Sequence, residues 1–308
     1  MKKKLLFALI VLMALPLLVF AGGTKEGQPS GQITIGLTLP GLQFPFFVTM
    51  KNDFDAAAAK LGVKVVFIDA QNDSTKQAAA MENFVAQKVS GILISPMTTD
   101  SLVPSIEAAV KAGIPVATVD RKANTDAVLV HIGADNVEGG RAAARYVVAK
   151  LNGKGNVIEL EGTPGASPAI DRKKGFDEVI AQNPGIKILV SQAADFNRAK
   201  ANSTMENLMQ AYPSFDAVFG ANDEMIIGAI EAMSAGGIDP SKKVTVGYDA
   251  TTDALDYIKQ GKLGATVDQF PGKQAAQALQ ALVDYIKNKT MPAQKVVYLS
   301  PNTVTSAK

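Results

Sequence analysis

A regular alternation of two kinds of segment constrains the fold of this chain more than any other feature. From Ile33 onward, short runs rich in β-branched residues, such as GILIS at 91–95, alternate with longer Ala-rich segments in which apolar residues recur about every 3.6 positions. Strands that are apolar along nearly their whole length are typical of parallel sheets covered by helices on both faces. The pattern predicts an α/β fold with two doubly wound parallel-sheet domains.

The bounds of the expected elements follow from the residues at which each pattern begins and ends. The expected strands are 33–39, 63–69, 91–95, 115–119, 127–133, 156–162, 186–192, 216–220, 243–249 and 263–269, with a further short strand near 295–299. The expected helices are 47–61, 74–88, 100–112, 136–151, 171–182, 198–211, 224–235, 252–260 and 272–288. Residues suited to cap helix N-termini are Ser74, Asp100, Asp135, Asn197 and Asp223.

The alternation of strands and helices breaks at two places. Two strands follow one another at 115–133, and a long helix after Gln269 leads into the short strand near 295–299. A chain that leaves one domain, builds a second and returns to the first would explain both breaks.

Residues 1–21 have the pattern of a secretory signal peptide, with Lys2 to Lys4 before an apolar run that ends at Phe20. The alternative is an uncleaved membrane anchor, but this run is shorter than the ~20 residues that a spanning helix needs. We therefore expect cleavage after Ala21, a flexible tether at 22–32, and a protein exported to the periplasm or another extracytoplasmic space. Since the chain has no cysteine, no lipid anchor is expected.

Composition excludes several classes of site and partner. The absence of cysteine excludes disulfides, a thiol nucleophile and thiolate metal sites, and a single histidine excludes a multi-histidine metal site. Three of the 31 basic residues and none of the 29 acidic residues lie in 1–21, which leaves 28 basic and 29 acidic residues in the rest. This balance argues against a nucleic-acid partner. We expect neither a cofactor nor a bound metal.

Polar and aromatic residues gather where the expected strands end, which is where open α/β sheets bind ligands. In chain order these positions are Phe44 to Phe47, Asp69 to Asn72, Ser95-Pro96, Asp120-Arg121, Gly162 to Arg172, Asp195-Phe196, Asn222-Asp223, Asp249 and Gln269. Carboxylates, amides and guanidinium groups can pair with neutral hydroxyls, and phenylalanine rings can cover the C–H faces of a sugar ring. Taken singly, Asp69, Asn72 and Asp223 are better read as cap or turn residues.

No nucleotide-binding or catalytic motif accompanies these residues. The first strand leads into TLPGLQFPFF rather than GxGxxG, and neither a phosphate-binding GxxxxGK[ST] loop nor a GxSxG elbow occurs. The glycine-rich stretch 162–167 could hold an anion but is better interpreted as a loop at a strand end. His131 lies within an apolar strand and is expected to be a buried structural residue. We therefore predict that the chain has no catalytic residues.

Taken together, these blocks of sequence resemble the periplasmic sugar-binding proteins of the ribose-binding type, which are receptors of ABC importers. The resemblance covers nearly all residues from Ile33 to about Thr305. It rests on PFF (45–47), DAQND (69–73), TVDR (118–121), HIGADNVEGG (131–140), VIELEG (157–162), DRKKGF (171–176), SQAADFNR (191–198), ANDEM (221–225), GYDA (247–250) and ATVDQFP (265–271).

The resemblance implies a set of ligand-binding residues and a mechanism. Ring stacking would come from Phe46, Phe47 and Phe196, and hydroxyl binding from Asp120, Arg121, Arg172, Asn222, Asp249 and Gln269. A lobe of 33–134 plus 270–298 and a lobe of 135–269 plus 299–308 would be joined by a multi-strand hinge and would close around a monosaccharide. The closed protein would then dock on a membrane permease; a chemoreceptor is a further candidate partner, and a monomer is expected.

Phe44 departs from the family pattern, because ribose-binding members have an asparagine just before Pro-Phe-Phe. A hydroxyl that loses its amide partner costs about 1–3 kcal/mol. A different monosaccharide, a deoxy sugar or a polyol is therefore as plausible as ribose, and Phe44 is included among the expected site residues. A furanone-type signal and an exported enzyme on this fold are the alternatives. A transcription regulator is excluded, because a signal peptide stands where its DNA-binding helix would be.

Overall fold

The computed structural model describes residues 31–306. The predicted signal peptide and nearly all of the predicted tether lie outside the described residues. Twelve strands, nine α-helices and one short 3-10 helix occupy the described part of the chain. Each predicted strand and helix has a counterpart there, so the prediction of an α/β fold is confirmed.

The first sheet has six parallel strands in the order β11-β5-β4-β3-β1-β2. Its strands are β1 (Thr34–Leu39), β2 (Lys64–Asp69), β3 (Gly91–Ile94), β4 (Val116–Val119), β5 (Val130–Ala134) and β11 (Val296–Leu299). The four helices associated with it are α1 (Pro45–Leu61), α2 (Ser74–Ala86), α3 (Val103–Lys111) and α9 (Pro271–Asn288). Since β11 and α9 come from the end of the chain, the predicted return to the first sheet is present.

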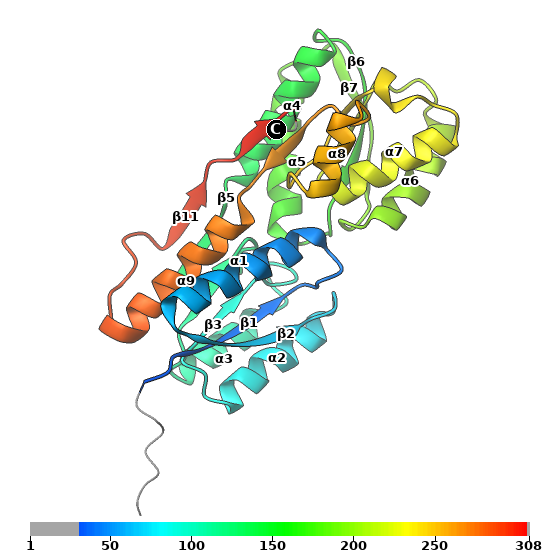
Figure 1. Cartoon of the computed structure of the whole chain (residues 1–308). Coiled ribbons are helices and arrows are strands. Elements are labelled where there is room, and N and C mark those ends of the chain that lie inside the picture. Colours follow the sequence, from blue (N-terminus) through cyan, green and yellow to red (C-terminus); the bar gives the residue numbers. More distant parts are fainter. Residues whose placement is uncertain (1–30, 307–308) are drawn as a thin grey trace, which may run out of the picture. The chain divides into compact units, whose positions relative to one another are not determined.

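The alternation of side chains along β3 shows why helices cover both faces of this sheet. Ile92 and Ile94 belong to a buried cluster with Phe84 of α2 and Ile106 of α3. Leu93, between them, belongs instead to the cluster that includes α1 and α9. Successive residues of a strand point to opposite faces, so an apolar run must be covered on both sides. In Figure 1, α1 and α9 lie side by side although they are far apart in the sequence.

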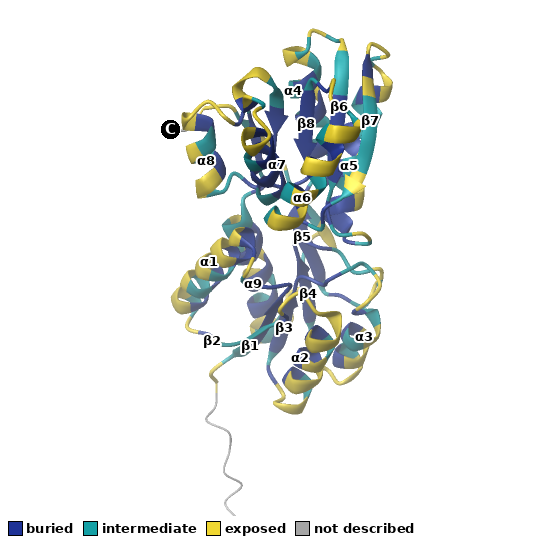
Figure 2. Cartoon of the chain, turned by 90° about the vertical axis from the view of Figure 1, so that its right-hand side faces the viewer, coloured by how far each residue is buried: buried dark blue, intermediate teal, exposed yellow. Residues whose placement is uncertain are grey.

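The second sheet has four parallel strands in the order β7-β6-β8-β9. Its strands are β6 (Gly155–Glu161), β7 (Ile186–Ala193), β8 (Ala217–Gly220) and β9 (Val244–Val246). The helices around it are α4 (Asn136–Lys150), α5 (Ser167–Ala181), α6 (Arg198–Ala211), α7 (Asp223–Ala235), η1 (Pro240–Lys242) and α8 (Thr252–Lys259). Figure 2 shows the inner surfaces of strands and helices buried and the outer helix surfaces exposed.

Glycine allows α4 and α5 to pack closely. A Cβ atom on Gly140 of α4 would lie 2.1 Å from the carbonyl oxygen of Arg172 on α5. A Cβ atom on Gly175 of α5 would lie 1.9 Å from the carbonyl oxygen of Val137 on α4. This reciprocal contact fixes the position of α5, and with it the position of the Arg172 side chain.

The strand predicted at 263–269 is not part of the second parallel sheet. β10 (Thr266–Asp268) forms an antiparallel pair with β12 (Asn302–Val304), a strand that the sequence analysis did not predict. Three residues are too few to show a period, so β12 gave no recognisable pattern. The chain passes from β5 to α4 at 134–136, from β10 to α9 at 268–271 and from β11 to β12 at 299–302. The lobe bounds given above stay a prediction.

Three of the predicted N-cap residues are wrong. α3 begins at Val103 rather than near Asp100, because Pro104 has no N–H to donate and is favoured in the first turn. The cap of α2 is Asp73 rather than Ser74, and that of α7 is Asn222 rather than Asp223. Among residues 31–306, no helix combines the length and apolar character needed to cross a membrane.

Candidate functional site

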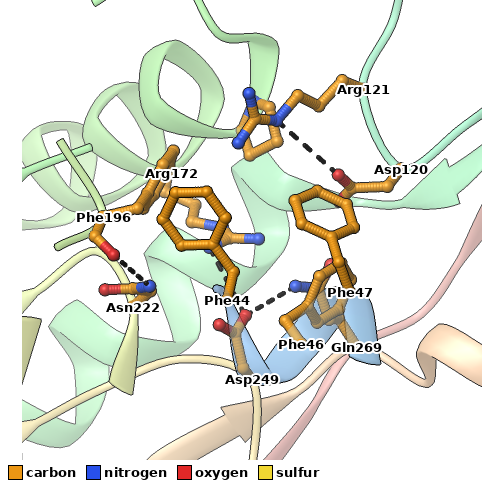
Figure 3. A pocket seen from close by; sticks show the side chains of 11 residues that line it. Phe44, Phe46, Phe47, Asp120, Arg121, Arg172, Phe196, Asn222, Asp249 and Gln269 are labelled. Carbon is orange, nitrogen blue, oxygen red and sulfur yellow. Dashed lines mark hydrogen bonds and ion pairs between the residues drawn. The ribbon is translucent and has the colours of Figure 1, made fainter. Parts of the chain in front are cut away.

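A single pocket brings together all ten of the residues predicted from the sequence, at the carboxyl ends of strands from both sheets (Figure 3). The space between the side chains, including the part open to solvent, measures about 320 Å³. Every one of the ten is at most 8 % exposed. The lining residues are Phe44, Phe46, Phe47, Asp120, Arg121, Pro168, Arg172, Phe196, Asn222, Asp249 and Gln269.

Three of the aromatic rings come from the start of α1. Phe44 is extended (φ −100°, ψ 116°) and precedes Pro45, whose fixed φ suits the first helical position. This turn places three rings in one cluster: Phe46 and Phe47 meet edge to face with centroids 5.1 Å apart, and Phe44 and Phe47 do so at 6.2 Å. The cluster gives the pocket an apolar wall.

The fourth ring, that of Phe196, lies against both arginines of the pocket. Its centroid is 5.6 Å from Cζ of Arg121 and 5.8 Å from Cζ of Arg172. A Cβ atom on Gly162, just beyond β6, would lie 2.1 Å from Cζ of this ring. Glycine at position 162 is therefore what allows the Phe196 ring to reach the pocket.

Asp120 and Arg121 follow β4 and form the polar part of the pocket on the first sheet. The Asp120 carboxylate accepts a hydrogen bond from Ser95 Oγ at 3.1 Å and lies 3.8 Å from Nε of Arg121. Nη1 of Arg121 donates to the Met97 carbonyl at 2.9 Å, but its buried Nε has no hydrogen-bond partner among the described residues. A buried donor without an acceptor is costly, so this nitrogen points to a ligand.

Burial perturbs both ionisable groups of this pair. It raises the pKa of Asp120, although Arg121, Arg172 and the Ser95 hydroxyl oppose the shift. It lowers the pKa of Arg121 to about 10, against the attraction of Asp120. Arg121 therefore remains a cation at neutral pH.

Arg172, Asp249 and Gln269 form a connected polar group on the side of the second sheet. Nε of Arg172 donates to Oδ1 of Asn136 at 2.8 Å, and its Nη1 donates to the Ala221 carbonyl at 2.7 Å. Nη1 of Arg172 also lies 3.6 Å from Oδ1 of Asp249, which accepts from Nε2 of Gln269 at 2.6 Å. These contacts fix the guanidinium plane and leave Nη2 of Arg172 and Oδ2 of Asp249 available for a ligand.

Two further interactions hold this group in place. The guanidinium carbon of Arg172 lies 3.6 Å from the centroid of the buried Tyr248 ring, a cation–π contact. Nε2 of Gln274 on α9 donates to the Gln269 carbonyl at 2.7 Å. Burial raises the pKa of Asp249 well above its usual value, with Arg172 opposing the shift.

Asn222 contributes an amide that is already partly used. Its Oδ1 accepts from the Met225 amide at 3.0 Å as the N-cap of α7, and its Nδ2 donates to the Phe196 carbonyl at 3.3 Å. These two bonds orient the amide between α7 and the Phe196 loop, which is the loop between β7 and α6. The second Nδ2 proton is free to bind a ligand.

Three residues of the pocket have unusual backbone conformations. Asp120 (φ 61°), Phe196 (φ 58°) and Asp249 (φ 115°) all lie in the left-handed region, which non-glycine residues rarely adopt. Each such residue costs about 1–3 kcal/mol and persists where the surrounding structure fixes it. Three of the pocket residues are therefore held in place at the expense of stability.

Sequence reasoning missed the residues that support the pocket rather than line it. Ser95 is among the residues at strand ends, and Asn136 lies within the HIGADNVEGG block (131–140), but the sequence analysis predicts no role in the site for either. Pro168 lies within the expected 162–172 segment and lines the pocket because α5 begins at Ser167 rather than near 171. The position of these residues shortly after a strand is the feature by which they could have been predicted.

His131 has the structural role that was predicted for it. The side chain is 4 % exposed, and its Nδ1 lies 3.0 Å from the Thr118 hydroxyl. Burial lowers the pKa of His131 to about 3, so the ring is neutral at physiological pH. Among residues 31–306, no group of three or more His, Asp or Glu side chains is arranged to hold a metal ion.

Comparisons with known proteins find similar sequences and structures over most of the chain. Residues 35–290 match the model of the family described as periplasmic binding protein domain. A ribose import binding protein of Bacillus subtilis is 40 % identical over 258 residues, which is 84 % of this chain and 83 % of that protein.

Two solved structures are similar over most of their length. The crystal structure of a Caulobacter myo-inositol binding protein has a TM-score of 0.86 and 36 % identity, covering 90 % of this chain and 94 % of the other. The binding protein of the arabinose ABC transporter of Shewanella, bound to L-arabinofuranose, has a TM-score of 0.85 and 32 % identity, covering 88 % and 91 %.

Proposed function

The chain belongs to the family of periplasmic binding protein domains, which are non-enzymatic receptors, and from this we propose that it captures a monosaccharide between two lobes for an ABC importer. Its role as a solute-binding receptor for sugars or polyols follows from the family. The monosaccharide, the closing motion and the delivery to a permease are the proposal.

The observation that carries the proposal is the division of one pocket into an aromatic part and a polar part. Four phenylalanine rings provide apolar surface that can cover the C–H faces of a sugar ring. Asp120, Arg121, Arg172, Asn222 and Asp249 provide charged or amide groups with atoms left free for hydroxyls. Charged groups bind hydroxyls strongly in a site shielded from water, so the pocket suits a small neutral polyhydroxylated ligand.

Phe44 restricts which ligand fits best. Its ring lines the pocket and cannot donate or accept a strong hydrogen bond, so a hydroxyl placed against it would be left unsatisfied, at a cost of about 1–3 kcal/mol. We therefore expect the preferred ligand to present a hydrogen or a methyl group to Phe44. A deoxy sugar, or a monosaccharide with an apolar edge, satisfies this requirement better than ribose.

Contacts between loops of the two sheets support closure around the ligand. The Thr99 amide, after β3, donates to the Gly165 carbonyl, after β6, at 3.0 Å. The Lys122 amide, after β4, donates to Oγ of Ser167 at 2.9 Å, and Nζ of Lys122 lies 3.1 Å from Oδ2 of Asp171. Such contacts form only while the lobes are together, which is the arrangement in which a permease would recognise the loaded receptor.

The remaining proposals concern location and partners. We propose that residues 1–21 direct export and are removed, that the protein acts as a monomer outside the cytoplasm, and that its partners are a membrane permease and, as a second candidate, a chemoreceptor. The similar Shewanella protein is described as a periplasmic binding protein, and the absence of cysteine rules out anchoring through a lipidated cysteine.

Ligand screening by thermal unfolding tests the proposed function. The protein is purified from cells that express the full chain and heated with D-ribose, L-arabinose, D-allose, a 6-deoxyhexose, myo-inositol or xylitol. A ligand at 100 times its Kd stabilises the folded state by about 2.7 kcal/mol, which raises the Tm by several degrees. We expect at least one monosaccharide to do so, and a deoxy sugar to act more strongly than its hydroxylated counterpart. If none of these compounds raises the Tm, the proposed function is wrong.

A further inference from the structure

Asp223 is a buried carboxylate that does not line the pocket. It is the first residue of α7 and is fully buried. The cap of this helix is Asn222, so the Asp223 side chain is free to point elsewhere. It has no ion pair with any residue of the described range 31–306. A buried carboxylate without a counter-ion is unfavourable unless its oxygens are bound, which raises the question of what it holds.

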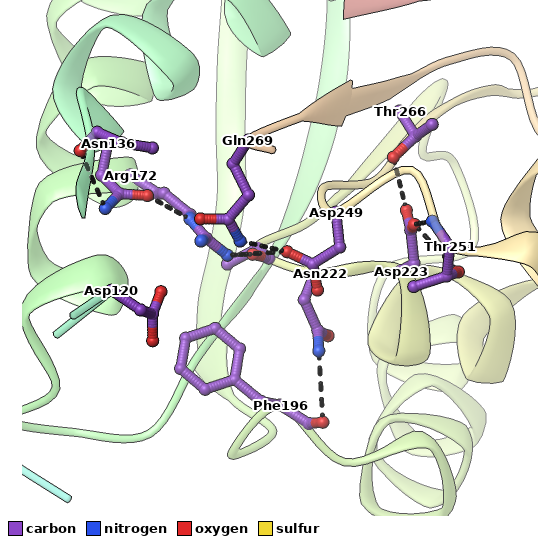
Figure 4. A network of polar contacts seen from close by, with 12 residues as sticks. Asp120, Asn136, Arg172, Phe196, Asn222, Asp223, Asp249, Thr251, Thr266 and Gln269 are labelled. Atoms are coloured by element: carbon purple, nitrogen blue, oxygen red, sulfur yellow. Dashed lines mark hydrogen bonds and ion pairs between the residues drawn. The ribbon is translucent and has the colours of Figure 1, made fainter. Parts of the chain in front are cut away.

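The hydrogen bonds of the Asp223 amide and carboxylate reach the loop between β9 and α8 directly or through Thr266 of β10, and this loop carries the pocket residue Asp249 (Figure 4). The Asp223 amide donates to the Tyr248 carbonyl at 2.7 Å. Its Oδ2 accepts from the amide and the hydroxyl of Thr251, at 2.8 and 3.1 Å. Its Oδ1 accepts from Oγ1 of Thr266 at 2.6 Å, and the same hydroxyl accepts from the Ala250 amide at 3.1 Å. Asp223 thus ties down both sides of Asp249: its backbone amide holds Tyr248, and its carboxylate holds Thr251 directly and Ala250 through Thr266.

This loop needs such support, because two successive non-glycine residues in it have positive φ. Asp249 has φ 115° and Ala250 has φ 52°. Backbone in this region persists only where the surrounding structure fixes it. The Asp249 side chain is held by only one hydrogen bond, from Gln269, and by a longer contact with Arg172. The direction of its carboxylate therefore also depends on the backbone conformation of Asp249 and Ala250.

The end of β9 is also shaped to admit the carboxylate. A Cβ atom on Gly247 would lie 2.4 Å from Oδ1 of Asp223, so a larger residue there would displace the side chain. We infer that Asp223 is a positioning residue that holds Asp249 in the orientation in which it binds the ligand. The affinity part of this inference rests on the proposed function, and the backbone part does not.

Hydrogen exchange tests the backbone part without any ligand. The protein is compared with Asp223→Asn and Thr266→Val, and the amide exchange rates are measured by NMR. An asparagine at 223 has an acceptor at only one of the two positions that the carboxylate oxygens occupy, so either Thr251 or Thr266 loses its acceptor. We expect the Thr251 or Ala250 amide to exchange at least tenfold faster in Asp223→Asn, and the Ala250 amide to do so in Thr266→Val.

Thr245→Val is the matched control for Thr266→Val. Thr245 is an equally buried threonine on β9, but its Oγ1 accepts from the Gly264 amide at 3.0 Å, donates to the Lys262 carbonyl at 3.4 Å and has no hydrogen bond to the loop that carries Asp249. The control should speed exchange at Gly264 and leave Ala250 and Thr251 unchanged. Unchanged exchange at Ala250 and Thr251 in both test variants would overturn the inference, and Thr266→Val decides it if Asp223→Asn does not fold.

A double-mutant cycle tests whether Asp223 acts through Asp249. Affinities for D-ribose and myo-inositol are measured by calorimetry for the original protein, Asp223→Asn, Asp249→Asn and the double variant. We expect Asp223→Asn to weaken binding at least tenfold alone and less than threefold in the Asp249→Asn background. Equal losses in both backgrounds would show that Asp223 has only a general structural role. If neither compound binds the original protein, the choice of ligand fails, while hydrogen exchange still decides the positioning role.

Discussion

Asp120 shows how one residue meets two demands that its sequence position alone does not reveal. It must supply a carboxylate at the end of β4, and it must do so with φ 61°. Aspartate and asparagine tolerate this left-handed conformation better than most residues, because their short side chains bond locally. Alanine at this position would therefore change both the chemistry and the backbone.

Asp120→Asn separates these two effects. It keeps the size and the backbone tolerance but replaces an oxygen by a nitrogen that can only donate, and it removes the charge next to Arg121. We expect ligand affinity to fall by about 2–3 kcal/mol, or about 30–150-fold, with little change in the Tm of the unliganded protein. Calorimetric titration and thermal unfolding measure the two quantities.

Asp126→Asn is the control for Asp120→Asn, since Asp126 is fully exposed on the loop that follows β4. Its affinity should equal that of the original protein. Undiminished affinity in Asp120→Asn would remove Asp120 from the ligand contacts.

At the scale of elements, the pocket depends on how the strand ends are packed as well as on the residues that line it. The end of β6 meets the Phe196 loop at Gly162, where an added Cβ atom would lie 2.1–2.6 Å from three atoms of the ring. The sequence analysis identifies Gly162 and Phe196 separately, because each follows a predicted strand. Their contact could not be predicted, because the order of strands in a sheet does not say which loop folds over which strand end.

Gly162→Ala should disturb the pocket without changing any residue that lines it. The Phe196 ring has to move away from Arg121 and Arg172, and overpacking of this kind costs about 1–3 kcal/mol. We expect a lower Tm, about a tenfold or greater loss of ligand affinity, and a displaced ring in the crystal structure of the variant.

Combining Gly162→Ala with Phe196→Leu tests whether the contact with the Phe196 ring causes the losses of Tm and affinity. In Phe196→Leu the ring is gone, so adding Gly162→Ala should then cost less than about 0.5 kcal/mol, the usual limit for independent sites. An undiminished cost in this background would mean that the Gly162 contact with Phe196 is not responsible.

At the scale of the whole molecule, buried carboxylates link stability to pH. Burial raises the pKa values of Asp120, Glu159, Asp223 and Asp249, with that of Asp223 at about 7. The unfolded chain releases these protons near pH 4, so above this pH the folded state binds more protons, and for Asp223 it does so up to about pH 7. The stabilisation is present at low pH and is lost as the pH rises through the folded pKa. His131 acts in the opposite direction below pH 6.5, because its folded pKa is lowered.

Comparison with Asp223→Asn isolates one of these groups from the others. We expect the unfolding free energy of the unliganded protein, relative to that of the variant, to fall by about 2 kcal/mol between pH 5 and pH 8. Urea unfolding at several pH values measures this difference. A difference that is constant with pH, or that grows toward pH 8, would contradict the assignment of a raised pKa to Asp223.

The sequence by itself determined the strand–helix alternation, the parallel sheets and the strand ends that carry chemistry. It did so because burial on both faces of a sheet demands apolar runs, and because parallel strands bring their carboxyl ends to one edge. The tertiary structure decided the β10–β12 pair, the contact between Gly162 and Phe196, and the hydrogen bonds of Asp223. These depend on contacts between segments far apart in the chain, such as Asp223 with Thr266, for which the sequence carries no local pattern.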